Sequence, residues 1–198
     1  MKNMTIENIV NHCSHILQNG KCKDLPYHNF AHTQEVIDKV YLISNAMGIQ
    51  PKEADFILIA ACFHDTGFSE AYDGHEEASK RLAEQYLATA NYSKSEIDRI
   101  CSYIGATKMP QNPPDIYAKI LCDADLFHLG TTDFWQRSLL LRKEWELFYG
   151  LVMTDSEWKL FNIKFLEEHQ FKTSYGKEVL EKGEQENLNK LKQLLQIK

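Results

Sequence analysis

Histidine and carboxylate side chains, which bind transition metals and transfer protons, gather in four short segments of this sequence. The segments are residues 27–32 (YHNFAH), His64-Asp65, His75-Glu76 and residues 122–125 (CDAD). If residues 27–32 were helical, His28 and His32 would share one face, because they are four residues apart. His64 and Asp65 end the most apolar stretch of the chain, where a buried charged pair is costly unless a partner satisfies it. A metal ion would satisfy both, because its charge stabilises the carboxylate and the imidazole lone pair.

Each cluster also has an ordinary structural interpretation. A single histidine near a helix end is more often a hydrogen-bonded structural residue than a ligand, and an aspartate after a loop is more often a helix cap. We keep the structural interpretation for four histidines, which are His12, His15, His128 and His169. The spacing of His28 and His32 suggests a zincin protease, but position 29 is Asn instead of the general base Glu, so that class is excluded.

Helical periodicity of the apolar residues accounts for most of the chain, and the alternation typical of strands is absent from the sequence. The predicted helices cover residues 5–18, 33–47, 52–64, 75–90, 93–106, 115–129, 132–149, 154–169 and 175–196. The helix over 52–64 is apolar nearly all round, which predicts a central and buried position. Ser93 with Glu96, and Thr154 with Glu157, form capping boxes that begin two of these helices. We therefore predict an all-α fold of eight or nine helices in one domain.

The composition fits a globular protein of 198 residues, of which 43% are hydrophobic and 25% are charged. A net charge of −6 disfavours general nucleic-acid binding, because such binding depends on neutralising phosphates. The longest apolar run, residues 56–63, is far shorter than the roughly 20 residues that span a bilayer, and the N-terminus lacks the apolar segment of a signal peptide. The five scattered cysteines argue against a disulfide framework, so we expect a cytoplasmic protein without a membrane partner.

Three segments of the chain, in this order, resemble the HD superfamily of metal-dependent phosphohydrolases. YHNFAHTQEV resembles the opening motif of cyclic-nucleotide phosphodiesterase catalytic domains. AACFHDTGF resembles the family's apolar helix that ends in His-Asp and a glycine turn, and ILCDADLFHLG resembles its closing A-D-x-hydrophobic segment. The resemblance covers about residues 25–130, and residues 131–198 are more weakly similar to the extra helices of a small bacterial-type subgroup. It implies a single HD-type helical domain over residues 1–198.

The resemblance implies a metal centre with two imidazole and two carboxylate ligands. The implied ligands are His32, His64, Asp65 and Asp125. Asp123 is an alternative to Asp125, and because it lies two residues back it would point about 200° away on a helix. Asp125 is preferred, since it fits the family's A-D-x-hydrophobic pattern. This mixed set suits a divalent transition metal (Mn, Fe, Co, Ni or Zn), as one ion or two, and Mg stays open for a second site.

Further catalytic roles follow from the resemblance. His28 matches the residue that donates a proton to the leaving group in the phosphodiesterases. His75 loosely matches an additional histidine of two-metal relatives, and with Glu76 it is a candidate for a second metal site or for orienting the attacking water. Asp65 would bridge the two metal positions if both were filled.

An acidic protein that binds phosphate also needs cationic side chains. Lys108, in the loop after the helix over 93–106, and Arg142, on the helix over 132–149, are the substrate-binding candidates. A solvated surface charge is the alternative for each. Aromatic residues that could line a base-binding pocket, or simply belong to the core, are Phe30, Phe68, Tyr72, Phe127 and Trp135.

The resemblance implies an enzyme in which a metal-activated water hydrolyses a phosphomonoester or phosphodiester bond of a small molecule. A nucleotide is the expected substrate, and the YHN motif slightly favours phosphodiester chemistry. The alternative is an HD-scaffold module that binds a nucleotide or regulates with little or no turnover, and a purely structural helical bundle is the third interpretation. The expected partner is the small phosphorylated substrate, and a homodimer stays open.

Overall fold

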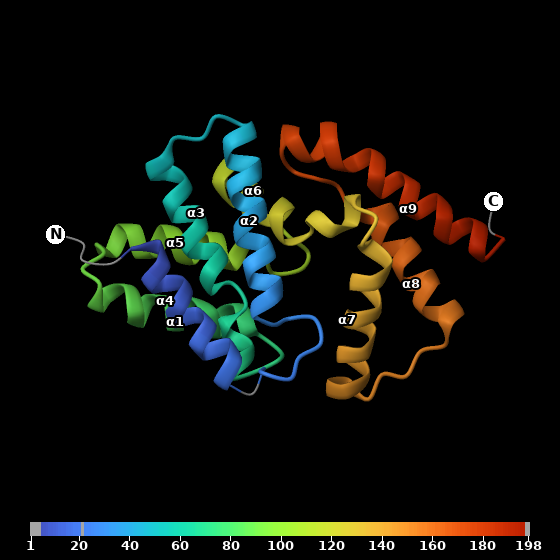
Figure 1. Ribbon diagram of the computed structural model, residues 1–198, viewed down its shortest axis with the longest axis horizontal. Helices are drawn as coiled ribbons and strands as arrows, with labels where there is room; N and C mark the ends of the chain where they lie inside the picture. Colours follow the sequence, from blue (N-terminus) through green and yellow to red (C-terminus); the bar gives the residue numbers. More distant parts are fainter. Residues whose placement is uncertain (1–4, 21, 197–198) are drawn as a thin grey trace. The chain divides into compact units, whose positions relative to one another are not determined.

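The computed structural model describes residues 5–20 and 22–196, and this part of the chain consists of helices and loops without a strand (Figure 1). The predicted all-α fold is thereby confirmed. Nine α-helices occur among the described residues, namely α1 (Ile6–Asn19), α2 (Phe30–Ala46), α3 (Pro51–Phe63), α4 (His75–Thr89), α5 (Lys94–Ala106), α6 (Ile116–Asp125), α7 (Phe134–Tyr149), α8 (Asp155–Glu168) and α9 (Glu181–Leu194). Two 3₁₀ turns, η1 (Thr66–Ser69) and η2 (Phe127–Gly130), and one π-helical turn, η3 (Gly176–Leu180), join them.

The chain divides into two compact units, of which the first ends at Asp125 and the second begins at Leu126. Helices α1–α6 belong to the first unit and α7–α9 to the second. The single domain over residues 1–198 stays a prediction. Among the described residues no helix combines the length and the apolar character needed to cross a membrane.

Helix α3 is the centre of the first unit. Its residues 56–63 are all buried, and it contacts α1, α2, α5 and α6. Neighbours are needed on every side because α3 is apolar nearly all round. Pro51 begins the helix, where its missing N–H costs no hydrogen bond. The predicted central position of this segment is confirmed, and the C-terminal end of α3 is consequently fixed by packing on several sides.

Side-chain caps define where several helices begin. Ser93 and Thr154 accept hydrogen bonds from the backbone N–H groups of Glu96 and Glu157, so both predicted capping boxes are present. Asn29 caps α2 through its Oδ1 atom, which accepts from the N–H groups of Ala31 and His32. The Asn29 cap fixes where α2 begins and therefore the position of His32 in its first turn.

Helix α6 ends earlier than the predicted helix over 115–129, because the chain tightens into the 3₁₀ turn η2. The reason lies in the second unit, where helix α9 packs against η2. A Cβ atom on Gly130 would lie 2.6 Å from the carbonyl oxygen of Leu180, and one on Gly183 would lie 2.1 Å from the carbonyl oxygen of Gly130. The Asn187 side chain adds hydrogen bonds to the carbonyls of Leu129 and Thr131. This close backbone approach replaces the last turn of the predicted helix.

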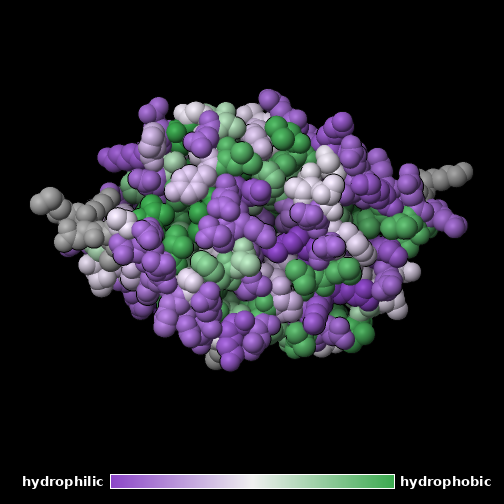
Figure 2. Space-filling model, viewed as in Figure 1, coloured by the Kyte–Doolittle hydropathy of each residue, from purple (hydrophilic) through white to green (hydrophobic). Residues whose placement is uncertain are grey.

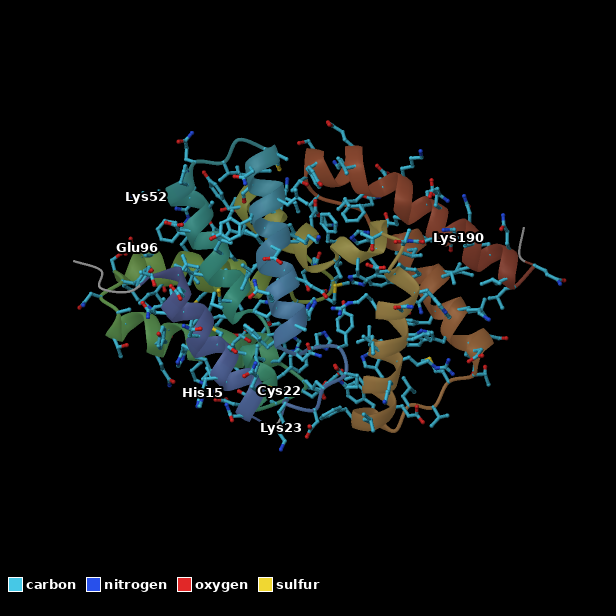
Figure 3. The ribbon with its side chains drawn as sticks, in the orientation of Figure 1. His15, Cys22, Lys23, Lys52, Glu96 and Lys190 are labelled. Atoms are coloured by element: carbon cyan, nitrogen blue, oxygen red, sulfur yellow. The ribbon has the colours of Figure 1, made fainter. Side chains whose placement is uncertain are left out.

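The visible surface is mixed in character. Hydrophilic residues cover most of the face in Figure 2, with smaller hydrophobic areas between them. Charged side chains such as Lys52 on α3 and Lys190 on α9 are exposed and extend away from the ribbon in Figure 3. Such a surface is ordinary for a folded chain with 25% charged residues.

Candidate metal centre

Three helices bring His32, His64 and Asp125 together inside the first unit. Their potential ligand atoms all lie within 4.8 Å of one another. The Nε2 atom of His32 is 3.1 Å from Oδ1 of Asp125, and Nε2 of His64 is 3.8 Å from the same oxygen. His32 and Asp125 are 93 positions apart in sequence. The three residues meet because α2, α3 and α6 contact one another pairwise. The three helices thus place two imidazoles and one carboxylate close together.

Asp65 completes this cluster from the other side. Its Oδ2 atom lies 3.1 Å from Nε2 of His64 and 3.5 Å from Nε2 of His32. The Nε2 atom of His64 and the Oδ2 atom of Asp65 are both buried without a hydrogen-bond partner. Two buried polar atoms that face each other in this way are costly unless a cation lies between or beside them. The donor set of two imidazoles and two carboxylates therefore fits a divalent transition metal.

The orientation of the imidazoles is set by backbone carbonyls. Nδ1 of His64 is 2.7 Å from the carbonyl oxygen of Ala61, and Nδ1 of His75 is 3.1 Å from that of Tyr72. A carbonyl oxygen only accepts, so each Nδ1 carries the proton and donates it. In the neutral form of each ring the Nε2 lone pair then faces the carboxylates, which is the tautomer that metal binding needs.

A tight junction after α3 holds the His64-Asp65 pair against the start of α4. The buried hydroxyl of Ser79 donates to the carbonyl of His64 (2.6 Å) and accepts from the N–H of Gly67 (2.8 Å). Gly67 has no room for a side chain, because a Cβ atom there would lie 1.9 Å from the carbonyl oxygen of His75. Ser79 could not be selected from the sequence, because its contribution depends on the meeting of two elements and leaves no local spacing signal.

A second group of polar side chains lies on the far side of Asp65. Nε2 of His75 is 3.7 Å from Oδ1 of Asp65 and 3.7 Å from Oε1 of Glu76, and Glu76 is buried. The carboxylate of Asp65 therefore has one oxygen toward His32 and His64 and the other toward His75. The structure brings His75 and Glu76 to the cluster.

His28 lies beside the cluster but not on the helix of His32. Helix α2 begins at Phe30 with Asn29 as its cap, so His28 precedes the helix and the two histidines do not share a helical face. Their ring centroids are nevertheless 5.9 Å apart, with the planes inclined by 86°. The His28 ring also stacks on Phe68 at 4.4 Å.

The two aspartates at the end of α6 are distinguished by the geometry. Asp125 belongs to the group of potential ligand atoms, whereas Asp123 is buried and does not belong to it. Oδ2 of Asp125, the oxygen that faces away from His32, accepts a hydrogen bond of 3.4 Å from Nε2 of Gln111. Gln111 belongs to the loop between α5 and α6, and it is not recognisable from the sequence, because a lone glutamine in a loop carries no motif.

The two predicted phosphate-binding cations belong to different units of the chain. Lys108 is exposed at the start of the loop between α5 and α6. Arg142 lies on α7 in the second unit, where its guanidinium donates to a carboxylate oxygen of Asp155 at 2.7 Å and to the carbonyl of Met153. Both substrate-binding assignments stay predictions.

The electrostatics of the cluster favour a cation. Burial opposes protonation of His64, but the adjacent Asp65 carboxylate outweighs it and raises the pKa of His64 to about 9. Burial by itself would raise the pKa of Asp65, and the neighbouring imidazole of His64 instead lowers it. Asp125 also has a lowered pKa, because the hydrogen bond to His32 outweighs its burial. Without a metal, a proton on His64 supplies the positive charge that the two carboxylates need.

Comparison with known proteins adds one finding. The HD-domain family matches residues 29–130, which is more than half of the chain. The matched range contains His32, His64, Asp65 and Asp125, and it begins one residue after His28. Searches of the curated proteins and of the solved structures gave no match.

Proposed function

Because this chain belongs to the HD-domain family of metal-dependent phosphohydrolases, we propose that it hydrolyses a phosphomonoester or phosphodiester bond of a small molecule, with a nucleotide as substrate. The observation that carries the proposal is the pair of buried atoms without hydrogen bonds, Nε2 of His64 and Oδ2 of Asp65, beside His32 and Asp125. Such an arrangement is unfavourable in a purely structural bundle and is stabilised by a bound cation.

The proposed ligands of the primary metal are His32, His64, Asp65 and Asp125. Imidazole and carboxylate ligands together suit Mn, Fe, Co, Ni or Zn. When bound, such a metal supplies a water activated for attack on phosphorus and neutralises charge on the phosphoryl group. The protein holds the ligand atoms in place through the α2, α3 and α6 packing and through the carbonyl of Ala61 behind His64.

A second cation position is proposed between Asp65, His75 and Glu76. The Oδ1 atom of Asp65 and the Oε1 atom of Glu76 both lie 3.7 Å from Nε2 of His75. This group has a higher share of carboxylate oxygens than the primary site, so Mg is a reasonable occupant. With the second position empty, His75 and Glu76 would orient the attacking water by accepting its hydrogen bonds.

His28 is the proposed proton donor. The leaving oxygen of a phosphate ester needs a proton as its bond to phosphorus breaks, and an imidazole is well suited to donate one near neutral pH. The ring of His28 is 6.2 Å from that of His75 and 5.9 Å from that of His32, at the edge of the ligand cluster. The substrate would then lie between the ligands and His28, with Lys108 as a proposed contact for phosphate.

The nucleotide part of the proposal is supported by aromatic side chains next to His28. Tyr72 and Phe30 are partly buried and pack against a small apolar cluster that also contains Phe68. Partly exposed aromatic faces can stack on a nucleobase. A phosphorylated molecule without a planar group could not stack on these aromatic faces.

The test combines metal analysis with a substrate panel. The full chain, loaded in turn with Mn, Fe, Co, Ni, Zn and Mg, is assayed on an aryl phosphate, a bis-aryl phosphate, nucleoside mono-, di- and triphosphates and cyclic nucleotides. We expect bound transition metal and product formation, with both abolished in Asp65→Asn, which keeps the side-chain shape but removes the charge. Glu77→Gln is the matched control, because Glu77 is an exposed carboxylate on α4 that pairs with Lys80.

Two results would contradict the proposal. A chain that binds none of these metals under any loading condition is not a metal-dependent enzyme. Tight nucleotide binding in the metal-loaded protein, without product from any substrate, would instead favour a nucleotide-binding module.

A further inference from the structure

The phenyl ring of Phe68 lies against two imidazoles at once. It stacks on His28 with centroids 4.4 Å apart and planes inclined by 24°, and on His75 with centroids 3.7 Å apart and planes inclined by 17°. The two imidazole centroids are 6.2 Å from each other. Phe68 therefore connects His28, from the loop before α2, with His75, the first residue of α4.

Phe68 itself is held firmly. Its side chain is buried in a small cluster with Leu17, Cys22 and Leu25, apart from the packing around α3. Its N–H donates to the carbonyl of Asp65 at 3.1 Å, which fixes the ring three residues beyond the His64-Asp65 pair. The ring is thus anchored both to an apolar cluster and to the segment that carries the candidate ligands.

The imidazoles need such a surface because their own torsions leave the ring planes loosely defined. The χ2 torsion of histidine is broad and roughly two-fold, unlike the staggered wells of aliphatic side chains. The Nδ1 hydrogen bond to the carbonyl of Tyr72 fixes one edge of the His75 ring, and Phe68 covers one of its faces. For His28 the edge-on contact of Tyr27, with planes inclined by 76°, complements the stack on Phe68.

We propose that Phe68 is a positioning residue that fixes the ring planes of His28 and His75 toward the metal centre. The inference rests on the proposed function for the roles of the two imidazoles, proton donation at His28 and the second cation position at His75. It adds that the side chain of Phe68 fixes the ring planes of both imidazoles. Loss of the phenyl ring frees both imidazoles while the primary ligands His32, His64 and Asp125 keep their own supports.

The experiment compares Phe68→Leu, which keeps apolar volume without a ring, with Phe68→Tyr, which keeps the ring. Leu87→Ala is the matched control, because Leu87 is also buried but lies near the C-terminal end of α4 and is not part of the Phe68 cluster. Two quantities are measured in each full-length variant. One is the ¹³C relaxation of the His28 and His75 ring carbons in the metal-free protein. The other is kcat and KM for the aryl phosphate at saturating metal, together with the affinity for Mn²⁺ alone.

In Phe68→Leu we expect lower order parameters for both rings and a fall in kcat of about 10- to 100-fold, because misplaced groups of this kind cost that much. KM and the Mn²⁺ affinity of the primary site should change less than about twofold, and Phe68→Tyr should recover most of kcat. Leu87→Ala should lower the stability without changing the ring order parameters or kcat. The inference is overturned if the two rings are as rigid in Phe68→Leu as in the unaltered protein, or if Leu87→Ala lowers kcat equally. If the unaltered protein turns over no substrate, the proposed function fails, and the relaxation data alone still decide whether Phe68 fixes the rings.

Discussion

Nε2 of His64 and Oδ2 of Asp65 lie 3.1 Å apart, both buried and neither with a hydrogen-bond partner. The two residues are adjacent in sequence, and the chain leaves α3 between them. His64 still has helical dihedral angles (φ −50°, ψ −38°), whereas Asp65 has φ −107° and ψ 1°. This change of direction turns two consecutive side chains toward the same point. A dipeptide thereby supplies two of the proposed ligands from one helix end.

Metal removal should lower the stability of the protein. A ligand that binds only the folded state stabilises it by mass action, by about 2.7 kcal/mol when the free metal is at 100 times its Kd. We expect the melting temperature to fall on treatment with a chelator and to recover when Mn²⁺ is returned in excess. Differential scanning calorimetry measures the shift, and Asp65→Asn should show none. An equal shift in that variant would place the metal elsewhere.

The stability of the metal-free protein and its affinity for metal should depend on pH in opposite directions. The pKa of His64 is raised from 6.5 to about 9, so without metal its contribution to folding is fully present below pH 6.5 and is lost as the pH rises through about 9. The lowered pKa of Asp65 means that its contribution is present above pH 3.8 and is lost on further acidification. Urea unfolding at several pH values tests this, with the surface variant His15→Gln as control.

Metal binding should follow the opposite trend. A bound metal must displace the proton from His64, so affinity should rise about tenfold per pH unit between roughly pH 6.5 and 9. Calorimetric titration in two buffers of different ionisation enthalpy would then record close to one proton released per metal at pH 7. Affinity that does not change with pH over this range would show that His64 is not a ligand.

Gly67→Ala should be strongly destabilising. The added Cβ would lie 1.9 Å from the carbonyl oxygen of His75 and 2.7 Å from the backbone nitrogen of Ser79, and neither backbone atom can move freely. We expect a loss of about 3 kcal/mol or more in the free energy of unfolding, at the upper end of overpacking effects. Gly105→Ala is the control, since the nearest atom to its Cβ would be the end of the Lys80 side chain at 3.5 Å. Comparable losses in the two variants would contradict the tight η1–α4 junction.

Gln111→Ala should weaken metal binding without unfolding the protein. Gln111 donates to Oδ2 of Asp125 and so orients the oxygen that faces His32. Loss of an outer hydrogen bond to a ligand typically costs about 10-fold or more in metal affinity. Mn²⁺ titration measures the change, with the exposed neighbour Asn112→Ala as control. Equal affinities for the two variants would remove Gln111 from the site.

The sequence was informative where chemistry and local pattern coincide. The apolar run over 56–63 predicted a buried helix, and the ordered set of His32, His64 and Asp125 predicted residues that the fold does bring together. The choice of Asp125 over Asp123 rested on the family pattern, and the geometry places Asp125 among the ligand atoms.

Other features depended on packing that no local pattern encodes. His28 lies before the helix cap instead of on α2, since Asn29 takes the capping role that fixes the helix start. Ser79 and Gln111 reach the cluster only because α4 and the α5–α6 loop fold against it. Phe68 could be predicted only as a pocket or core residue, because its two imidazole neighbours come from segments 40 residues before it and 7 residues after it.

The burial of α3 also has a consequence for how such a chain can diversify. Eight consecutive side chains ahead of His64 are enclosed by other helices, so a change in the size of any of them alters where His64 lies. Substitutions in α3 therefore cannot adjust the site without moving His64. The segments over 70–74 and 108–115 contain exposed positions and lie close in sequence to Asp65 and to Gln111, which contacts Asp125. Natural variation in substrate preference should therefore accumulate in these two loops, while α3 stays nearly constant.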